Sequence, residues 1–406
     1  MDSLTSDSQA ILLLTGHFGG KTQSDARPLS ATEYSRLAYW LRDRELRPGD
    51  LLDTDTRKQL AEWPDDRIKP PRLQALLDRG MALAFATEQW QRAGLWVITR
   101  SDPEYPRDRF KKLGLKNAPP VLYGSGHRPL LGGGGLAIVG SRDAGDTDLT
   151  FTRQLAEQTA LAGKSVISGG ARGVDETAML AALEKEGTVI GILANDLLKT
   201  TLSRKYRRAL QDNQLVLLSP FNPEARFNAG NAMARNKFIY CLADAAVVVH
   251  SGTRGGTWTG ALENLDAGWV PLWIKPSDDP DAGNQALVEK GGQWLDETLL
   301  RQGIDTLWGE TPPSAPPEPT PVPAVQAEQD LGRFLADHSL YEIFRLKLEK
   351  LLASEAYPPE ELENRLDIAR TQLNTWLKQG VEEGWLIKDK GKSVRYRLDW
   401  QQKLLA

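Results

Sequence analysis

Apolar runs alternate with amphipathic stretches most regularly between residues 136 and 187 of the chain. Residues 136–139 form a short apolar run that stops at Gly-Ser-Arg, residues 140–142. Apolar residues then recur near helical spacing until a second apolar run, residues 165–167, which stops at the glycine-rich turn 168–173. This pattern predicts a strand–helix–strand–helix unit in which each strand runs into a glycine turn.

Further apolar runs of strand length follow this unit, with amphipathic stretches between them. The runs lie at residues 188–194, 215–220, 244–252 and 269–274, and helices are expected at 201–211, 229–242 and 257–267. Strands that are apolar on both faces and alternate with helices indicate a parallel sheet covered by helices on both sides. We therefore predict an α/β fold for residues 94–310, a doubly wound, Rossmann-like parallel sheet.

The flanking segments have other patterns. Residues 1–93 have the pattern of a helical domain of the sterile-alpha-motif or helix–hairpin–helix type. The turn His-Phe-Gly-Gly at 17–20 fits either a grip on a DNA backbone or a simple helix cap, and the cap is the commoner use of such glycines. Prolines predict a stiff, extended linker at 311–330. Residues 331–406 have the order of three helices and a hairpin, which predicts a winged helix.

Composition limits the class of protein. The 406 residues are enough for about three domains, and 40% of them are hydrophobic. One cysteine fits a reducing cytoplasm, and the pattern shows neither an N-terminal leader nor a membrane span, so we expect a soluble, cytoplasmic protein without membrane contact. With a net charge of −4, the protein must bind any nucleic acid through a local basic cluster.

The two glycine turns suggest phosphate chemistry. Each turn precedes a helix and contains an arginine, Arg142 or Arg172, so bare backbone N–H groups at two helix N-termini are expected to meet phosphate oxygens. Neither turn has the dinucleotide-binding or P-loop spacing. The alternative is that these glycines only let tight connections close.

In such sheets, ligands bind beyond the carboxyl ends of the strands. The loops there and the helix at 229–242, whose polar residues could otherwise form only a solvated face, supply the candidate phosphate or DNA contacts. These are Gly140, Ser141, Arg142, Ser168, Gly169, Gly170, Arg172, Gly173, Asn231, Arg235, Asn236, Lys237, Ser251 and Gly252. We predict no catalytic residue, metal site or cofactor.

Several motifs, in one order, resemble the DNA-processing family DprA, also called Smf. They are Tyr-Pro at 105–106, APPVLYGSG, IVGSR, SGGARGVDETA, ARNKFIYCLAD and SGTRGGTWTGA, which together cover about residues 94–275. The resemblance implies an extended Rossmann fold that binds single-stranded DNA, a homodimer, and transfer of the strand to a RecA-type recombinase. It also implies that Arg142, Arg172 and the Arg235–Lys237 triplet contact the DNA.

The chain departs from this family at two places. Residues 194–210 replace the usual segment after the third strand, and we interpret its basic residues as a solvated helix face: Arg204, Lys205, Arg207 and Arg208. Lys237 stands where the family has an arginine, which keeps the charge but loses bidentate geometry.

Two alternatives remain open. The motif GGTWTGALE resembles that of LOG enzymes, which hydrolyse nucleoside monophosphates, but Trp258 replaces a motif glycine and Glu263 is one position late. A nucleotide-sensing module belongs to the same alternative. A regulatory subunit of a defence or toxin–antitoxin system would keep the fold and change the biology.

Two further sets of residues are candidates for contacts with partners. Tyr240, Trp258 and Trp269 fit either a dimer surface or the core. The winged helix has its own candidate contacts, and DNA and protein are equally suitable partners for it. These candidates are Arg370, Asn374, Lys378, Lys390, Lys392 and Arg395.

Overall fold

The structure is a computed structural model that describes residues 4–18, 27–114, 116–295, 303–308, 340–352, 357–366, 368, 370–390 and 394–398. The chain divides into two compact units, Met1–Pro312 and Pro313–Ala406. The predicted linker at 311–330 lies outside the described residues. No described helix combines the length and the apolar composition that a membrane crossing requires.

A nine-stranded sheet forms the centre of the first unit, in the order β1-β2-β6-β5-β4-β3-β7-β8-β9. From β6 to β9 all neighbouring strands are parallel, whereas β1 and β2 form an antiparallel edge beside β6. The strands are β1 (Trp96–Thr99), β2 (Val121–Gly126), β3 (Leu136–Val139), β4 (Val166–Ser168), β5 (Val189–Ile192), β6 (Leu215–Ser219), β7 (Ala245–Val248), β8 (Leu272–Ile274) and β9 (Gln293–Trp294).

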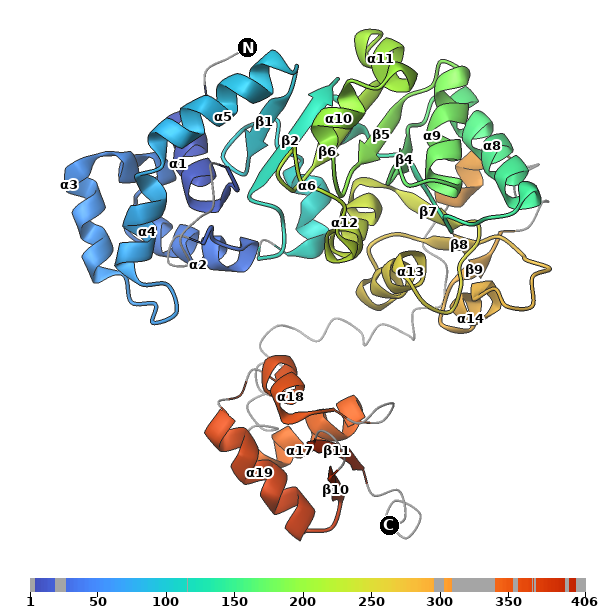
Figure 1. Ribbon diagram of the computed structural model, residues 1–406. Coiled ribbons are helices and arrows are strands. Elements are labelled where there is room, and N and C mark those ends of the chain that lie inside the picture. The colour runs from blue at the N-terminus through green and yellow to red at the C-terminus, as the bar shows by residue number, and fades with distance from the viewer. Residues whose placement is uncertain are drawn as a thin grey trace, which may run out of the picture. The chain divides into compact units, whose positions relative to one another are not determined.

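Helices cover both faces of this sheet, as Figure 1 shows. Along β3, Leu136 and Ile138 belong to the core on one face, and Ala137 and Val139 to the core on the other. The first face carries α8 (Asp146–Leu161), α9 (Val174–Glu184), α10 (Leu197–Thr201) and α11 (Arg204–Gln211). The second carries α6 (Arg107–Phe110), α7 (Leu130–Gly133), α12 (Ala229–Leu242), α13 (Gly256–Ala267) and α14 (Asn284–Glu289). The predicted doubly wound fold is confirmed.

The N-terminal helices pack against the antiparallel edge of the sheet and share the core of its first face. These are α1 (Ser6–Thr15), α2 (Ala31–Arg42), α3 (Thr54–Arg57), α4 (Pro70–Leu77) and α5 (Gly80–Arg92), with short 3-10 turns at Pro48–Leu52 and Lys58–Glu62. A capping box begins α2: the Glu33 backbone N–H donates to Ser30 Oγ, and the Ser30 N–H donates to Glu33 Oε2. Gly16 ends α1, and the glycines at 19 and 20 lie outside the described residues.

The second unit has the predicted order of three helices and a hairpin. It consists of α17 (Leu340–Leu352), α18 (Pro359–Leu366), α19 (Arg370–Glu382), β10 (Leu386–Lys390) and β11 (Val394–Leu398), with the two strands antiparallel. Leu373 and Leu377 of α19 are buried in a small core with residues of the hairpin.

Candidate nucleic-acid interface

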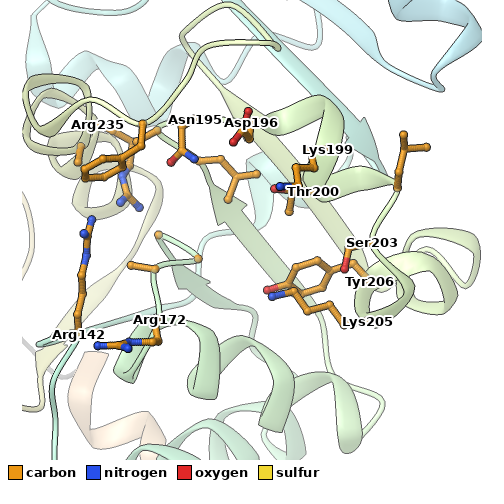
Figure 2. Close-up of a pocket in the computed structure, with 18 residues that line it drawn as sticks. Arg142, Arg172, Asn195, Asp196, Lys199, Thr200, Ser203, Lys205, Tyr206 and Arg235 are labelled. Carbon is orange, nitrogen blue, oxygen red and sulfur yellow. The ribbon is translucent and has the colours of Figure 1, made fainter.

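An open cavity of about 850 Å³ lies beside the carboxyl ends of β4 and β5. Five cationic side chains line it, against one carboxylate, Asp196. The cations are Arg142, Arg172, Lys199, Lys205 and Arg235. Figure 2 shows Arg142 and Arg172 on one side of the hollow and Lys199 and Lys205 on the opposite side. The cavity therefore has the charge that a polyanion requires.

Arg235 is the most buried of these cations, at 4% exposure, so α12 presents no solvated face there. Its Nη1 donates a 2.7 Å hydrogen bond to the Ile192 carbonyl at the end of β5. A Cβ on Gly169 would lie 1.6 Å from the same nitrogen. The glycine after β4 is therefore required by the space that the buried guanidinium occupies.

Asp175, in the first turn of α9, connects the two glycine turns. Its carboxylate accepts hydrogen bonds from the backbone N–H groups of Ala171, Gly169 and Gly140. Burial raises the pKa of Asp175, and the nearby Arg235 guanidinium and these N–H groups oppose the rise. Sequence reasoning missed this residue, although an aspartate two positions after a glycine turn is a typical partner for unpaired N–H groups.

Several of the backbone N–H groups that we expected to meet phosphate are engaged within the protein. Besides those that face Asp175, the Val174 N–H donates to the Ser141 carbonyl. Gly173, with φ +87°, permits this close approach of the two turns. The first turn of α8 carries Asp146 and Asp148, and Asp148 is 2.9 Å from Lys275 Nζ. Phosphate contacts must therefore come mainly from side chains.

The two turn arginines are positioned differently. The Arg142 guanidinium lies over the ring of Phe227, 4.8 Å from its centroid, and 53% of Phe227 is exposed. Arg172 is exposed and forms an ion pair of 2.5 Å with Asp143. An exposed aromatic face beside a cation is a surface on which an unpaired base can stack.

The segment between β5 and α11 forms the opposite wall, which sequence reasoning missed. Lys199 and Lys205 line the cavity there, and Lys205 pairs with Glu176 of α9. All four residues of the basic cluster are exposed, as expected, but Lys205 also lines the cavity, whereas Arg204, Arg207 and Arg208 line neither central cavity. The sequence did contain an indication of this wall. Residues 194–210 follow the carboxyl end of a strand, and ligands bind beyond the carboxyl ends of the strands in such sheets.

A second cavity, of about 410 Å³, shares Arg142, Phe227 and Arg235 with the first and extends between β3 and β7. It brings together four further candidates, which are Gly140, Ser141 and Gly252 of the turns and Asn236 of α12. The candidate residues after β3, β4 and β7 therefore surround one continuous region.

Five candidates lie elsewhere, and one of them is Gly173, which permits the close approach of the two turns. Lys237 lines neither cavity, because two positions along a helix rotate a side chain about 200° from Arg235, and its Nζ lies 5.3 Å from the Phe238 ring centroid instead. Asn231 also lines neither cavity. Ser168 is buried and donates to the Ile138 carbonyl, and Ser251 is buried and donates to the Gly252 carbonyl. These two serines are structural.

The glutamate that a LOG-type hydrolase would use also lies outside the central cavities. Glu263 of α13 lines neither cavity, and burial raises its pKa. Within the described part of the chain, no three His, Cys, Asp or Glu side chains gather as metal ligands would. Tyr240 is buried, while Trp258 and Trp269 are half-buried and pack against the core.

Acidic neighbours balance several winged-helix candidates. Arg370 Nη1 is 3.1 Å from Glu363, and Lys378 Nζ is 3.6 Å from Glu382. Asn374 and Arg395 are exposed, Lys390 ends β10, and Lys392 lies outside the described residues. The described candidates of this unit therefore present less unbalanced positive charge than the central cavity.

Comparisons with known proteins find relatives of this chain in one family. The profile of a family described as DNA recombination-mediator protein A matches residues 96–301. Protein Smf of Synechocystis is 30% identical over 175 residues, 42% of this chain and 43% of that protein. The DNA processing protein DprA of Bacillus subtilis is 25% identical over 279 residues, 67% of this chain and 86% of that protein.

Among solved structures, the crystal structure of DNA processing protein A from Streptococcus pneumoniae matches with a TM-score of 0.57 and 18% identity. It covers 74% of this chain and 99% of that one. That likeness supports the fold, and the profile match extends over about half of the sequence. The chain belongs to the DNA recombination-mediator protein A family.

Proposed function

We propose that the protein binds single-stranded DNA through the central basic cavity and acts as a recombination mediator that passes the strand to a RecA-type recombinase. One observation carries this proposal: five cations and one carboxylate line a single open cavity in a chain of net charge −4. Contacts with phosphates dominate the affinity of nucleic-acid binding, and a local cluster supplies them here.

Phe227 favours a single strand over a duplex. Its ring is exposed at the cavity edge beside Arg142, so an unpaired base can stack on it while its phosphate contacts the cations. In a duplex, paired and stacked bases do not present such a face. Little dependence on base sequence is expected, since every base has a stacking face.

The family resemblance leads us to propose a cytoplasmic homodimer that binds without catalysis. The position of Glu263 supports the last point, because it is outside both cavities, and Asp175 is engaged by backbone N–H groups. Release of free base from nucleoside monophosphates, lost in Glu263→Gln, would instead establish the hydrolase alternative.

Fluorescence anisotropy over a salt series tests DNA binding. If the four exposed cations each contact one phosphate, the slope of log affinity against log salt is about −2.8 for a single strand. Arg142→Ala, Arg172→Ala and Lys199→Ala should each flatten it by about 0.7. Arg92→Ala, an exposed arginine of α5 paired with Glu88, is the control and should leave the slope unchanged.

A different result would place the DNA site outside the central cavity. If the three cavity variants bind like wild type while Arg370→Ala with Lys378→Ala abolishes binding, the DNA site is in the C-terminal unit. The central cavity would then serve another ligand.

A further inference from the structure

A separate cavity of about 590 Å³ lies between the N-terminal helices and the segment that follows β1. It shares no lining residue with either central cavity. Its walls come from α1, α2, the turn after α2 and residues 100–107. Neither the family match nor the proposed DNA site explains this cavity.

The lining is unevenly charged. Four arginines face two carboxylates, Asp7 and Glu45; the arginines are Arg42, Arg47, Arg100 and Arg107. Asp7 is already engaged, since its Oδ1 accepts a 2.8 Å hydrogen bond from the Gly49 N–H and its Oδ2 lies 3.6 Å from Arg47 Nε. The carboxylates therefore do not neutralise the cavity.

Arg100 is held entirely by neutral groups. It donates to Ser35 Oγ at 2.8 Å and to the Ala118 carbonyl, and it lies over the Tyr34 ring. Its Nε is buried without a partner among the described residues. Burial lowers the pKa of Arg100, and the groups that oppose this effect are tyrosines rather than carboxylates. Its positive charge is thus uncompensated.

Arg107 lies next to it and is exposed. Its Nη2 donates to the Arg100 carbonyl, which fixes the side chain at the cavity without neutralising it. No described carboxylate forms an ion pair with either arginine. Two oriented guanidinium groups without acidic partners form a site for a planar or tetrahedral oxyanion, and phosphate suits their fork geometry.

An aromatic side chain completes the cavity. Tyr39 of α2 is 37% exposed, with the Arg42 guanidinium 4.9 Å from its ring centroid. The volume is within the range of small-ligand sites, roughly 300–1,000 Å³, and larger than a bare phosphate needs. We propose that this cavity binds a nucleoside phosphate, with its phosphate on Arg100 and Arg107 and its base against Tyr39.

The phosphate has two possible sources, a free nucleotide or the terminal nucleotide of a DNA strand. Calorimetry at constant ionic strength distinguishes them, with deoxyadenosine 5′-monophosphate as one probe and a short oligonucleotide, with or without a 5′-phosphate, as the other. The full chain carries Arg142→Ala and Arg172→Ala, which weakens binding at the central cavity, and variants at Arg107 and Arg47 report on this separate cavity alone. Failure of DNA binding at the central cavity therefore leaves this test intact.

In that background, the mononucleotide or the 5′-phosphorylated oligonucleotide should bind saturably. Arg107→Ala should weaken binding about tenfold or more, and Arg47→Ala should weaken it less, because Arg47 is partly neutralised by Asp7. Arg92→Ala controls for the loss of one charge and should stay within about twofold of its parent. Both test arginines are exposed, and unchanged melting temperatures verify that the variants fold.

The proposal is overturned if neither phosphate-bearing probe binds saturably at up to about 10 mM. It is also overturned if Arg107→Ala and Arg47→Ala bind like their parent, or if Arg92→Ala loses as much affinity as they do. Binding of the mononucleotide assigns a free nucleotide as the source of the phosphate. Binding of the 5′-phosphorylated oligonucleotide alone assigns a DNA end.

Discussion

Replacing Gly169 with alanine tests whether the buried Arg235 determines the shape of the central site. The new Cβ would lie 1.6 Å from Arg235 Nη1 and 2.4 Å from its Cζ, so the guanidinium must move. It cannot move without weakening its 2.7 Å hydrogen bond to the Ile192 carbonyl and its attraction to the buried Asp175.

The magnitude follows from these contacts. A hydrogen bond from a charged donor contributes about 1.5–3 kcal/mol, and overpacking a tight site costs about 1–3 kcal/mol. We therefore expect Gly169→Ala to destabilise the folded state by about 3–5 kcal/mol. At roughly 2 °C per kcal/mol for a unit of this size, the melting temperature falls by about 6–10 °C.

A double-mutant cycle, followed by thermal unfolding, separates this mechanism from a general glycine effect. In Arg235→Met the guanidinium is absent, so adding Gly169→Ala should cost much less than it does in wild type. Gly80→Ala, at the start of α5 with no atom within 4 Å of its Cβ, is the control and should leave stability unchanged or slightly raised. Additive costs in the cycle, or a Gly169→Ala variant as stable as Gly80→Ala, would refute the reasoning.

Two further predictions concern the DNA contacts of the same cavity. Asp143→Asn should raise the affinity for single-stranded DNA by about two- to fivefold, because an exposed ion pair such as Arg172–Asp143 contributes about 0.2–1 kcal/mol that binding must overcome. An equal gain in Asp146→Asn would attribute the effect to net charge alone. Phe227→Ala should lose about 1–3 kcal/mol of binding free energy, measured by anisotropy, while Phe227→Tyr retains it. Wild-type affinity in Phe227→Ala would exclude base stacking there.

The fold was predictable because its strands are buried on both faces. Runs such as residues 136–139 and 245–248 contain no polar residue, and glycines mark where the strands end. The antiparallel edge was less predictable, since an apolar run of strand length says nothing about the direction of the strand. The short edge strand β9 has two residues, too few for a periodic signal.

The site was predictable to the extent that topology determines it. Parallel strands bring their carboxyl ends to one edge, so the turns after β3, β4 and β7 converge there. The orientation of individual side chains was not predictable from the sequence. Arg235 and Lys237 are two residues apart, and only the packing of α12 against β5 decides which of them enters the cavity.

Ionisation of Glu33 makes the stability of the N-terminal helices depend on pH, and the sign of this dependence follows from the pKa of Glu33. Although burial acts to raise its pKa, hydrogen bonds from Arg72 and Ser30 outweigh burial and lower it from 4.5 to about 2. The Arg72 nitrogens lie 2.8 and 3.2 Å from its carboxylate oxygens, and both side chains are largely shielded from solvent.

Because the pKa of Glu33 is lower in the folded state than in the unfolded state, its charge stabilises the fold fully above about pH 4.5. That stabilisation is lost as pH falls toward about 2. Glu33→Gln keeps an acceptor for the Ser30 N–H but removes the charge, so it should cost on the order of 2 kcal/mol at pH 7. The difference between the two proteins in urea unfolding should shrink steadily below about pH 4.5. Asp53→Asn, at the exposed N-cap of α3, controls for a cap that has no arginine partner among its contacts. A Glu33→Gln deficit that stays constant down to pH 3 would mean that the lost stability comes from packing, not from the charge that Arg72 binds.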